Sequence, residues 1–190
     1  MTEEEIIISA TRQFNQYGLK FTMQDISDDL HIAKKTIYQF YTSKEDLLNA
    51  MMDSGFAKIQ EQKRLILAEK IPYLEKLRKV MIAMPEQYAM VDFRKLSELK
   101  EKYPSVYQNL RSHLETDWEP IIDLLKKGMK EHKIKQVSIP VLKTMVTSSF
   151  DAFLSTDTLK TSKVAYADAL NAMMDIIMSG IAEDEHEAHK

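Results

Sequence analysis

Residues 21–48 read FTMQDISDDLHIAKKTIYQFYTSKEDLL, and this stretch decides the fold of the N-terminal part of the chain. Thr22 can cap a first short helix, because its hydroxyl can accept from free N–H groups near Asp25. Ser43 can cap a later helix that carries an acid three residues on. The apolar residues at helical spacing are Met23, Ile26 and Leu30, then Ile32, Ile37 and Phe40. The pattern predicts two short helices joined by a tight turn at residues 29–31 and followed by a long helix. That arrangement is a helix-turn-helix, whose second helix has the right diameter to enter a DNA major groove.

The second short helix carries polar side chains on its outward face. Lys34 and Lys35 could reach phosphates or guanine, and Gln39 could pair with adenine, while Thr36 could touch a thymine methyl group or a phosphate. In an isolated helix of this kind, Lys34, Lys35 and Gln39 would more often form an ordinary solvated face, and Tyr38 would serve only in packing. The helix pattern on both sides of it favours DNA binding instead.

The same stretch resembles the DNA-binding signature of TetR/AcrR-type transcriptional regulators. The matching segments are residues 26–27 (IS), 32–40 (IAKKTIYQF) and 43–48 (SKEDLL), with an upstream run at 8–14 (ISATRQF) and Tyr17-Gly18 that is similar to the first helix of that family. The resemblance covers about residues 5–50. It implies that Tyr38 contacts the DNA backbone and that Lys44, at a helix start, contacts a phosphate. The candidate DNA-binding residues are Thr22, Lys34, Lys35, Thr36, Tyr38, Gln39 and Lys44.

The turn departs from the pattern of that family, which commonly has Ala-Gly-Val-Ser where this chain has Leu30-His31-Ile32-Ala33. A glycine would take a left-handed backbone at no steric cost. If His31 adopts that backbone, it carries a strain of roughly 1 kcal/mol. Ala33 also lacks a hydroxyl that could cap the second helix or touch a phosphate.

The composition predicts an all-α protein. The 190 residues include only 4 glycines and 5 prolines, with 12 methionines, and this mixture favours helix nearly throughout. The absence of cysteine excludes disulfides and thiol chemistry and suits a reducing compartment. No apolar run approaches the ~18 residues of a membrane span, and the acidic start MTEEE lacks the basic region of a signal peptide. We therefore expect a cytoplasmic protein that does not contact a membrane.

The charge balance is unusual for a DNA-binding segment. Residues 1–50 hold five lysines and arginines against eight acids, a balance of −3 that equals the net charge of the whole chain. The groove-facing residues 33–44 contain three lysines and no acid. We expect few phosphate contacts and a shallow dependence of DNA affinity on salt.

Prolines and helical periodicity divide the rest of the chain. The helices expected lie at 3–17, 43–70, 72–84, 85–101, 104–130, 139–156 and 161–180, with Pro120 kinking or breaking the 104–130 segment near Trp118. The domains expected are a helix-turn-helix domain at 1–47, a helical ligand-binding and dimerisation domain at 48–181, and an acidic tail at 182–190. The long helix from Ser43 would connect the two domains mechanically.

The second domain contains enough large apolar residues to enclose a small molecule. By the resemblance, an effector site lies among its helices, and we expect a mostly apolar ligand. The candidate ligand-binding residues are Phe56, Ile59, Met81, Met84, Tyr88, Phe93, Tyr107, Leu110, Leu114 and Trp118. Polar groups that could orient a ligand are Asp92, Glu98, His113 and Asp117. The alternative is a core filled by its own side chains, with methionine filling gaps.

Two C-terminal segments carry wide apolar stripes. Such helices can bury one side in their own domain and the other against a second copy, which would make a four-helix bundle in a homodimer. The candidate dimer-interface residues are Val141, Met145, Phe150, Phe153, Leu170, Met173, Met174 and Ile177. Ordinary packing within one subunit explains only part of these stripes. A two-fold dimer would present two copies of the DNA-reading helix.

The sequence offers little support for an enzyme. The five histidines show no metal-ligand spacing, there is no glycine-rich phosphate loop, and no nucleophile motif occurs. We therefore expect no metal, no cofactor and no catalytic residues. The prediction is a transcriptional repressor that binds a palindromic double-stranded DNA operator as a homodimer under small-molecule control. The alternative is a helical dimeric ligand- or protein-interaction module without sequence-specific DNA binding.

Overall fold

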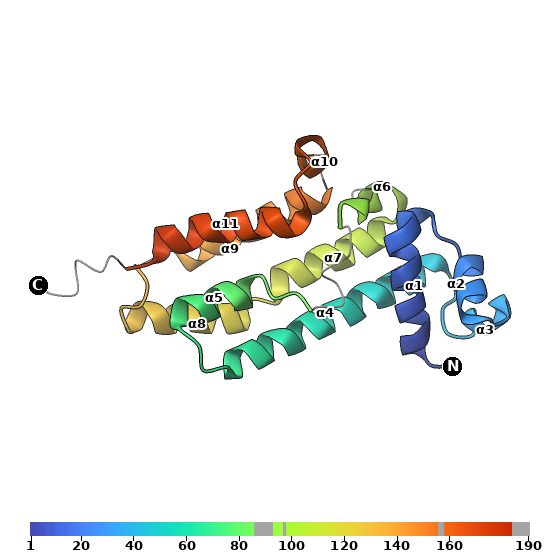
Figure 1. The fold of residues 1–190 in the computed structure, drawn as a ribbon, viewed down its shortest axis with the longest axis horizontal. Helices are drawn as coiled ribbons and strands as arrows, with labels where there is room; N and C mark the ends of the chain where they lie inside the picture. Colours follow the sequence, from blue (N-terminus) through green and yellow to red (C-terminus); the bar gives the residue numbers. More distant parts are fainter. Residues whose placement is uncertain (86–92, 97, 156–157, 184–190) are drawn as a thin grey trace, which may run out of the picture.

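The computed structural model describes residues 1–85, 93–96, 98–155 and 158–183, and Figure 1 shows their arrangement. The prediction of an all-α fold is confirmed, because the regular structure of these residues is helical. An isolated antiparallel bridge joins Ile134 to Ala182.

Three helices form the N-terminal end of the molecule: α1 (Glu3–Tyr17), α2 (Met23–Leu30) and α3 (Lys34–Ile37), with a 3-10 turn η1 (Gly18–Lys20) after α1. The first helix has the predicted bounds. It starts at a capping box in which the Thr2 hydroxyl accepts from the Glu5 N–H, and it ends at Gly18, whose φ of 60° suits a glycine. Local sequence signals are therefore sufficient to define this helix.

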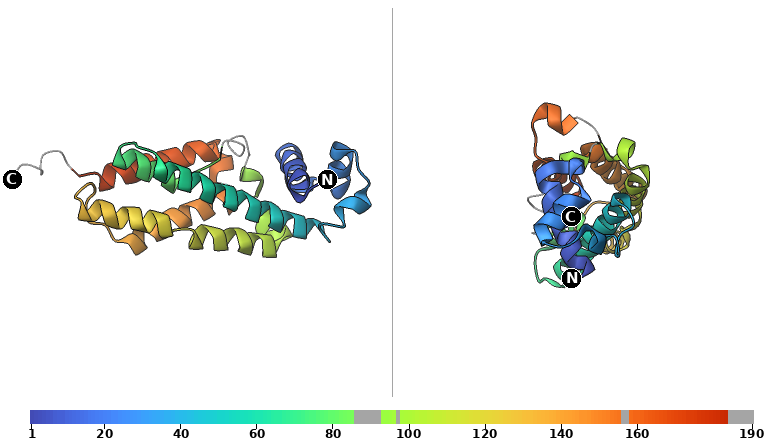
Figure 2. Two further views of the ribbon diagram at one scale, coloured as in Figure 1. Left: turned by 90° about the horizontal axis from the view of Figure 1, so that it is seen from below. Right: turned by 90° about the vertical axis from the view of Figure 1, so that its right-hand side faces the viewer.

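The long helix α4 (Lys44–Ala68) runs from the N-terminal helices along much of the length of the molecule (Figures 1 and 2). Its first turn is capped as predicted, since the Ser43 hydroxyl accepts from the Asp46 N–H at 3.0 Å. One continuous helix therefore connects the N-terminal helices to the helical bundle.

The remaining helices are α5 (Tyr73–Met81), η3 (Phe93–Leu96), α6 (Leu99–Lys102), α7 (Pro104–Thr116), α8 (Glu119–Lys130), α9 (Ile139–Ser155), α10 (Thr158–Ser162) and α11 (Tyr166–Ile181). They complete an elongated bundle in which α5 and α7 contact α4, while α10 projects from one side (Figures 1 and 2). The expected break near Trp118 is confirmed, because α7 ends at Thr116 and Pro120 stands in the first turn of α8.

Two helix predictions are wrong. The expected helix at 85–101 is not continuous: Pro85 is not helical, and η3 and α6 are short separate turns, while residues 86–92 and 97 lie outside the described part. Leu96 and Leu99 are both buried in the N-terminal core, and this tertiary burial overrides local helix propensity. The helix expected at 161–180 is divided into α10 and α11, with Lys163 at a left-handed φ of 56° between them.

The apolar interior consists of two clusters. One joins α1, α2 and the start of α4 to Leu96, Leu99, Val106, Leu110 and Leu154 from later parts of the chain. The other is built mainly from α5, α8, α9 and α11, with Leu77, Leu125, Ile134, Val146 and Met174 fully or almost fully buried. The N-terminal helices therefore share a continuous core with the helices after residue 48. The division at 47/48 stays a prediction, and the acidic tail lies outside the described residues from 184 onward.

Candidate nucleic-acid interface and internal cavity

The helix α3 and the turn after it form an exposed polar surface at one end of the elongated molecule (Figure 1). Lys34, Lys35 and Gln39 are exposed there and Tyr38 is 44% exposed, whereas Ile37 is fully buried and anchors the helix. The Lys34 ammonium lies 5.9 Å from the centre of the Tyr38 ring. Thr36 is half-buried. Four of the candidate DNA-binding side chains are therefore free to meet a partner on one surface.

His31 takes a left-handed backbone in the turn between α2 and α3. This residue has φ 54° and ψ 43°, and the Ser27 hydroxyl donates to the Ile32 carbonyl beneath it. Ala33 is the N-cap of α3 and makes no side-chain capping bond. The chain therefore carries strain at the residue that orients α3, and the departure from glycine has an energetic cost.

We expect His31→Gly to raise the free energy of unfolding by about 1 kcal/mol, because glycine adopts this backbone without a steric penalty. Chemical denaturation followed by circular dichroism measures the change. His132→Gly is the matched variant, since His132 has φ 52° at the far end of the molecule and should show a similar gain. An unchanged or lowered stability in His31→Gly would contradict the strain.

A polar cluster that the sequence did not predict fixes α2 against α1. The Ser9 hydroxyl donates to the Asp29 carboxylate, and Arg12 Nη2 lies 2.6 Å from Asp29 Oδ2. Hydrogen bonds from Ser9 and Arg12 lower the pKa of Asp29 below its usual value. Ser9 and Arg12 stand three apart on α1, which places both on one helix face. Any movement of α1 would therefore be passed to the helix-turn-helix.

Two of the candidate DNA-binding residues have structural roles. The Thr22 hydroxyl accepts from the Asp25 N–H at 3.2 Å, and Asp25 Oδ2 accepts from the Thr22 N–H at 2.6 Å, which forms the capping box of α2. Lys44 is half-buried, and its ammonium donates to the carbonyls of Leu19, at 2.6 Å, and Phe21. Burial lowers the pKa of Lys44. The ammonium of Lys44 therefore holds the segment between α1 and α2, and its phosphate contact stays a prediction.

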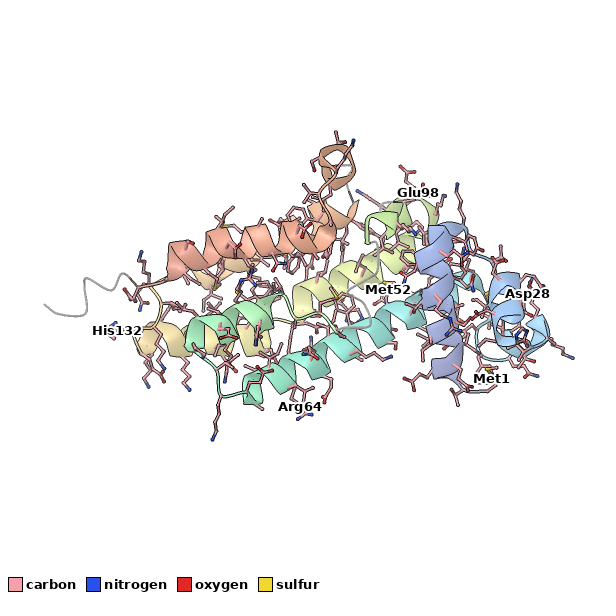
Figure 3. The ribbon with its side chains drawn as sticks, viewed as in Figure 1. Met1, Asp28, Met52, Arg64, Glu98 and His132 are labelled. Carbon is pink, nitrogen blue, oxygen red and sulfur yellow. The ribbon has the colours of Figure 1, made fainter. Side chains whose placement is uncertain are left out.

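A cavity of about 150 Å³ lies between α1, α4, α7 and the C-terminal helices. Met52, which lines it, is labelled in Figure 3 close to the place where α1 meets α4. The candidate ligand-binding residues that line the cavity are Phe56, Ile59, Met81, Met84, Leu110, Leu114 and Trp118. Tyr107 does not line it, and its hydroxyl donates to Asp151 Oδ1 at 2.7 Å. Tyr88 and the side chain of Phe93 lie outside the described residues.

The sequence missed that the cavity reaches the N-terminal domain. Thr11 and Phe14 of α1 belong to its wall, and Phe14 is also buried in the N-terminal core. Four other buried residues of that core also line the cavity, and they are Met51, Leu96, Leu110 and Leu154. No local pattern could have indicated this, because the wall forms from segments that are distant in the sequence.

Polar groups line the part of the cavity wall formed by α4 and α7. The buried Lys63 ammonium donates to the main-chain carbonyl of Asp117 at 3.0 Å. His113 stacks on Phe56 with ring centroids 4.4 Å apart, and its Nε2 lies 2.9 Å from Asp53 Oδ1. His113 and Asp117 were expected as orienting groups, and both line the cavity. Glu98 is exposed and pairs with Lys102, so it is not one of them, and Asp92 lies outside the described residues.

The apolar stripes of α9 and α11 divide between the core and the surface. Val141 and Met145 are each 56% exposed, and Ile176, which was not among the candidates, is 75% exposed. The dimer-interface prediction is corrected for three residues that are buried within the subunit, namely Leu170, Met174 and Ile177. Three other candidates are half-buried, namely Phe150, Phe153 and Met173. Phe150 lines the cavity, and Phe153 packs edge-on against Tyr166. The reason is that each helix has two apolar sides, and periodicity does not tell which one meets the core.

Within the described ranges, none of the helices is long and apolar enough to pass through a membrane. In those ranges, no three His, Asp or Glu side chains are placed to hold a metal ion together.

The N-terminal helices match a known family. Residues 6–51 fit the model of bacterial regulatory proteins of the tetR family. Over 184 residues the chain is 23% identical to an uncharacterized HTH-type transcriptional regulator of Bacillus subtilis, YvaF, and the match covers 96% of this chain and 97% of YvaF.

Solved structures share the fold over nearly the whole chain. A TetR transcription regulator from Haloarcula marismortui superposes with a TM-score of 0.76 at 14% identity, covering 95% of this chain and 98% of the other. The Bacillus subtilis regulator FadR, solved in complex with stearoyl-CoA, superposes with a TM-score of 0.67 at 18% identity, covering 95% and 100%. Regulators of this kind bind DNA and are not enzymes. The chain is thus a transcriptional regulator whose helix-turn-helix, within residues 6–51, belongs to the tetR family of bacterial regulatory proteins, and the TetR-type fold covers 95% of the chain.

Proposed function

We propose that this regulator represses transcription as a homodimer on a palindromic operator, under the control of a small, mostly apolar effector. The observation that carries this proposal is the shared wall of the cavity. Thr11 and Phe14 of α1 line it together with residues of α4 and α7. A ligand held there would touch the DNA-binding domain directly, without a relay through several helices.

Effector control needs a physical route from the cavity to α3, and the contacts of α1 supply one. The Lys95 ammonium of η3 donates to the Asn15 carbonyl at the end of α1, while Ser9 and Arg12 hold Asp29 of α2. A displacement of α1 would therefore carry α2 and the attached α3 with it. The ligand changes DNA affinity only by the difference between its affinities for the two arrangements. The FadR complex with stearoyl-CoA supports this part of the proposal, since that protein shares the fold and holds a small molecule.

The dimer would form through the outward face of α9 and α11, which lie next to each other along one side of the bundle (Figure 1). On the described part of these two helices, the exposed large apolar side chains are Val141, Met145 and Ile176. A two-fold axis there would place two copies of α3 on the same side of the duplex. The two helices can then read half-sites about one helical turn, roughly 34–36 Å, or a multiple of it apart. A palindromic operator follows from that symmetry.

The test begins with selection of bound duplexes from a random pool by the purified protein, followed by fluorescence anisotropy titrations on the selected site. We expect an inverted repeat and a preference over random duplex of at least about 1,000-fold. Equal affinity for selected and random duplexes would instead support the alternative, an interaction module without sequence-specific DNA binding. Transcription in vitro from a promoter that overlaps the selected site then tests repression.

Substitutions on α3 should separate base contacts from backbone contacts. We expect Gln39→Ala or Lys35→Ala to lower operator affinity by about 5- to 100-fold and to relax preference at one base pair of each half-site. Tyr38→Ala should lower affinity for all sequences alike. Titrations against single-base operator variants measure the difference.

The control for these substitutions is Gln108→Ala, an exposed glutamine on α7, which should leave the affinity unchanged. If Gln39→Ala and Lys35→Ala left base preference as it was, the assignment of α3 as the reading helix would be wrong.

A further inference from the structure

The cavity contains a buried ammonium with spare hydrogen-bonding capacity. Lys63 on α4 is only 8% exposed and lines the cavity, and its ammonium donates to the Asp117 carbonyl at 3.0 Å. An ammonium has three donors, and among the described residues that carbonyl is the acceptor recorded for it. Its neighbour Arg64 points away from the bundle into solvent (Figure 3), so the burial belongs to Lys63 in particular. Leaving a buried donor unmatched is costly.

The same region of the cavity presents an unmatched acceptor. Asp117 also lines the cavity, and its Oδ2 is buried with no hydrogen-bond donor among the described residues. The nearest titratable neighbour is His113, whose Nδ1 lies 3.8 Å from that oxygen, beyond hydrogen-bond reach. His113 is engaged instead with Asp53, which also accepts from Asn109 at 2.8 Å. Within the part of the chain that the structure describes, Lys63 therefore has two unmatched donors and Asp117 has an unmatched acceptor, and both residues line the cavity.

The size and wall of the cavity suit one aromatic ring. A volume of about 150 Å³ equals that of an engineered protein cavity that holds benzene. The wall has aromatic surface and much aliphatic and methionine surface, and its Phe, Trp and Tyr residues are Phe14, Phe56, Trp118, Phe150 and Tyr166. Aromatic rings pack favourably against such surfaces in offset or edge-on arrangements.

The charges decide which substituent the ring carries. Lys63 and Asp117 have opposite formal charges, so a neutral ligand leaves the buried region without excess charge. A carboxylate could pair with Lys63, but it would bring a second anion close to the Asp117 carboxylate. A hydroxyl both accepts and donates, so one ligand oxygen can match one donor of Lys63 and the free oxygen of Asp117.

We propose that the cavity binds a neutral single-ring phenol, whose hydroxyl accepts from Lys63 and donates to Asp117. This proposal rests on the effector role of the cavity and names the chemical class of the ligand.

The test compares three ring compounds of similar size, each titrated into the full chain without DNA by isothermal titration calorimetry. They are phenol, toluene, in which a methyl group replaces the hydroxyl, and benzoate, in which a carboxylate does. Trp118 is the only tryptophan of the chain and lines the cavity, so its fluorescence reports whether binding occurs there. We expect phenol to bind about tenfold or more tightly than toluene, and benzoate to bind less tightly than phenol.

Substitutions test the two polar partners. Lys63→Met keeps the length of the side chain and removes the donor, and it should weaken phenol about tenfold while changing toluene by less than about twofold. Asp117→Asn keeps the main-chain carbonyl that Lys63 uses and should also weaken phenol. The matched control is Arg64→Met, which removes a cation from the same helix at an exposed position and should leave both ligands unaffected. Circular dichroism confirms that each variant is folded.

Equal affinity for phenol and toluene, tighter binding of benzoate than of phenol, or unchanged phenol binding in Lys63→Met would each overturn the proposal. A separate operator titration with and without phenol distinguishes this proposal from the effector role. Binding of phenol at Trp118 with no change in operator affinity would leave the ligand assignment standing and would refute effector control by this ligand. Release of the operator by a ring compound that lacks a hydroxyl would support effector control through the cavity and would refute the assignment of a phenol as its ligand.

Discussion

The double variant Met145→Glu, Ile176→Glu is expected to be monomeric and to bind the operator at least about 100-fold less tightly than the unaltered chain. Both side chains are largely exposed on the outward face of α9 and α11, at 56% and 75%. A two-fold axis brings each substituted position close to its copy or to the other position, so that four carboxylates would meet in an apolar contact. A monomer also loses the gain of holding two half-sites at once, which amounts to about 10²- to 10⁴-fold. Sedimentation velocity measures the assembly state, and anisotropy measures the affinity.

The control for the dimer variant is Leu65→Glu. Leu65 is an exposed apolar residue on α4, away from the proposed face, at 47% exposure. It should tolerate a glutamate with no change in assembly state or operator affinity. A double variant that remained dimeric would show that the two copies meet elsewhere, and the assignment of α9 and α11 would have to be abandoned.

Lys44→Met is expected to lower the free energy of unfolding by about 2 kcal/mol or more. The ammonium satisfies two main-chain carbonyls, those of Leu19 and Phe21, and methionine would leave both without a donor. The segment between α1 and α2 would loosen, so that affinity for all DNA sequences should fall together. Urea denaturation gives the stability, and anisotropy on operator and random duplexes gives the affinity.

Lys34→Met provides the comparison, because Lys34 is exposed and belongs to the same domain. Its stability should change by less than about 0.5 kcal/mol, while its DNA affinity falls. A Lys44→Met variant with weakened DNA binding and unaltered stability would mean that Lys44 acts mainly on the DNA backbone after all.

The helix-turn-helix could be predicted from the sequence because its determinants are local. Caps at Thr22 and Ser43 and the apolar residues of each short helix lie within a few residues of the bonds they make. The same holds for the break near Trp118, where a proline cannot continue the preceding helix. The left-handed backbone of His31 was also foreseeable, since it stands at the position where a glycine is usual.

The sequence could not predict in the same way which partners a long side chain contacts, or which side of a C-terminal helix is buried. Lys44 was expected to reach a phosphate, but a flexible ammonium takes whichever acceptors the fold brings near, and here these are main-chain carbonyls. In α11, Met174 and Ile176 are only two residues apart, and one is buried while the other is largely exposed. Both belong to wide apolar stripes, so that periodicity could not decide which side meets the core.

The sequence by itself determined the all-helical class, the helix-turn-helix and the exposed polar face of α3, because capping and periodicity act between residues that are close along the chain. Only the tertiary structure decided that Thr11 and Phe14 of α1 share a cavity with α4 and α7, and that Lys63 and Asp117 meet at its wall. These groups are separated by tens of residues. Their meeting depends on how whole helices pack, and no local pattern encodes that.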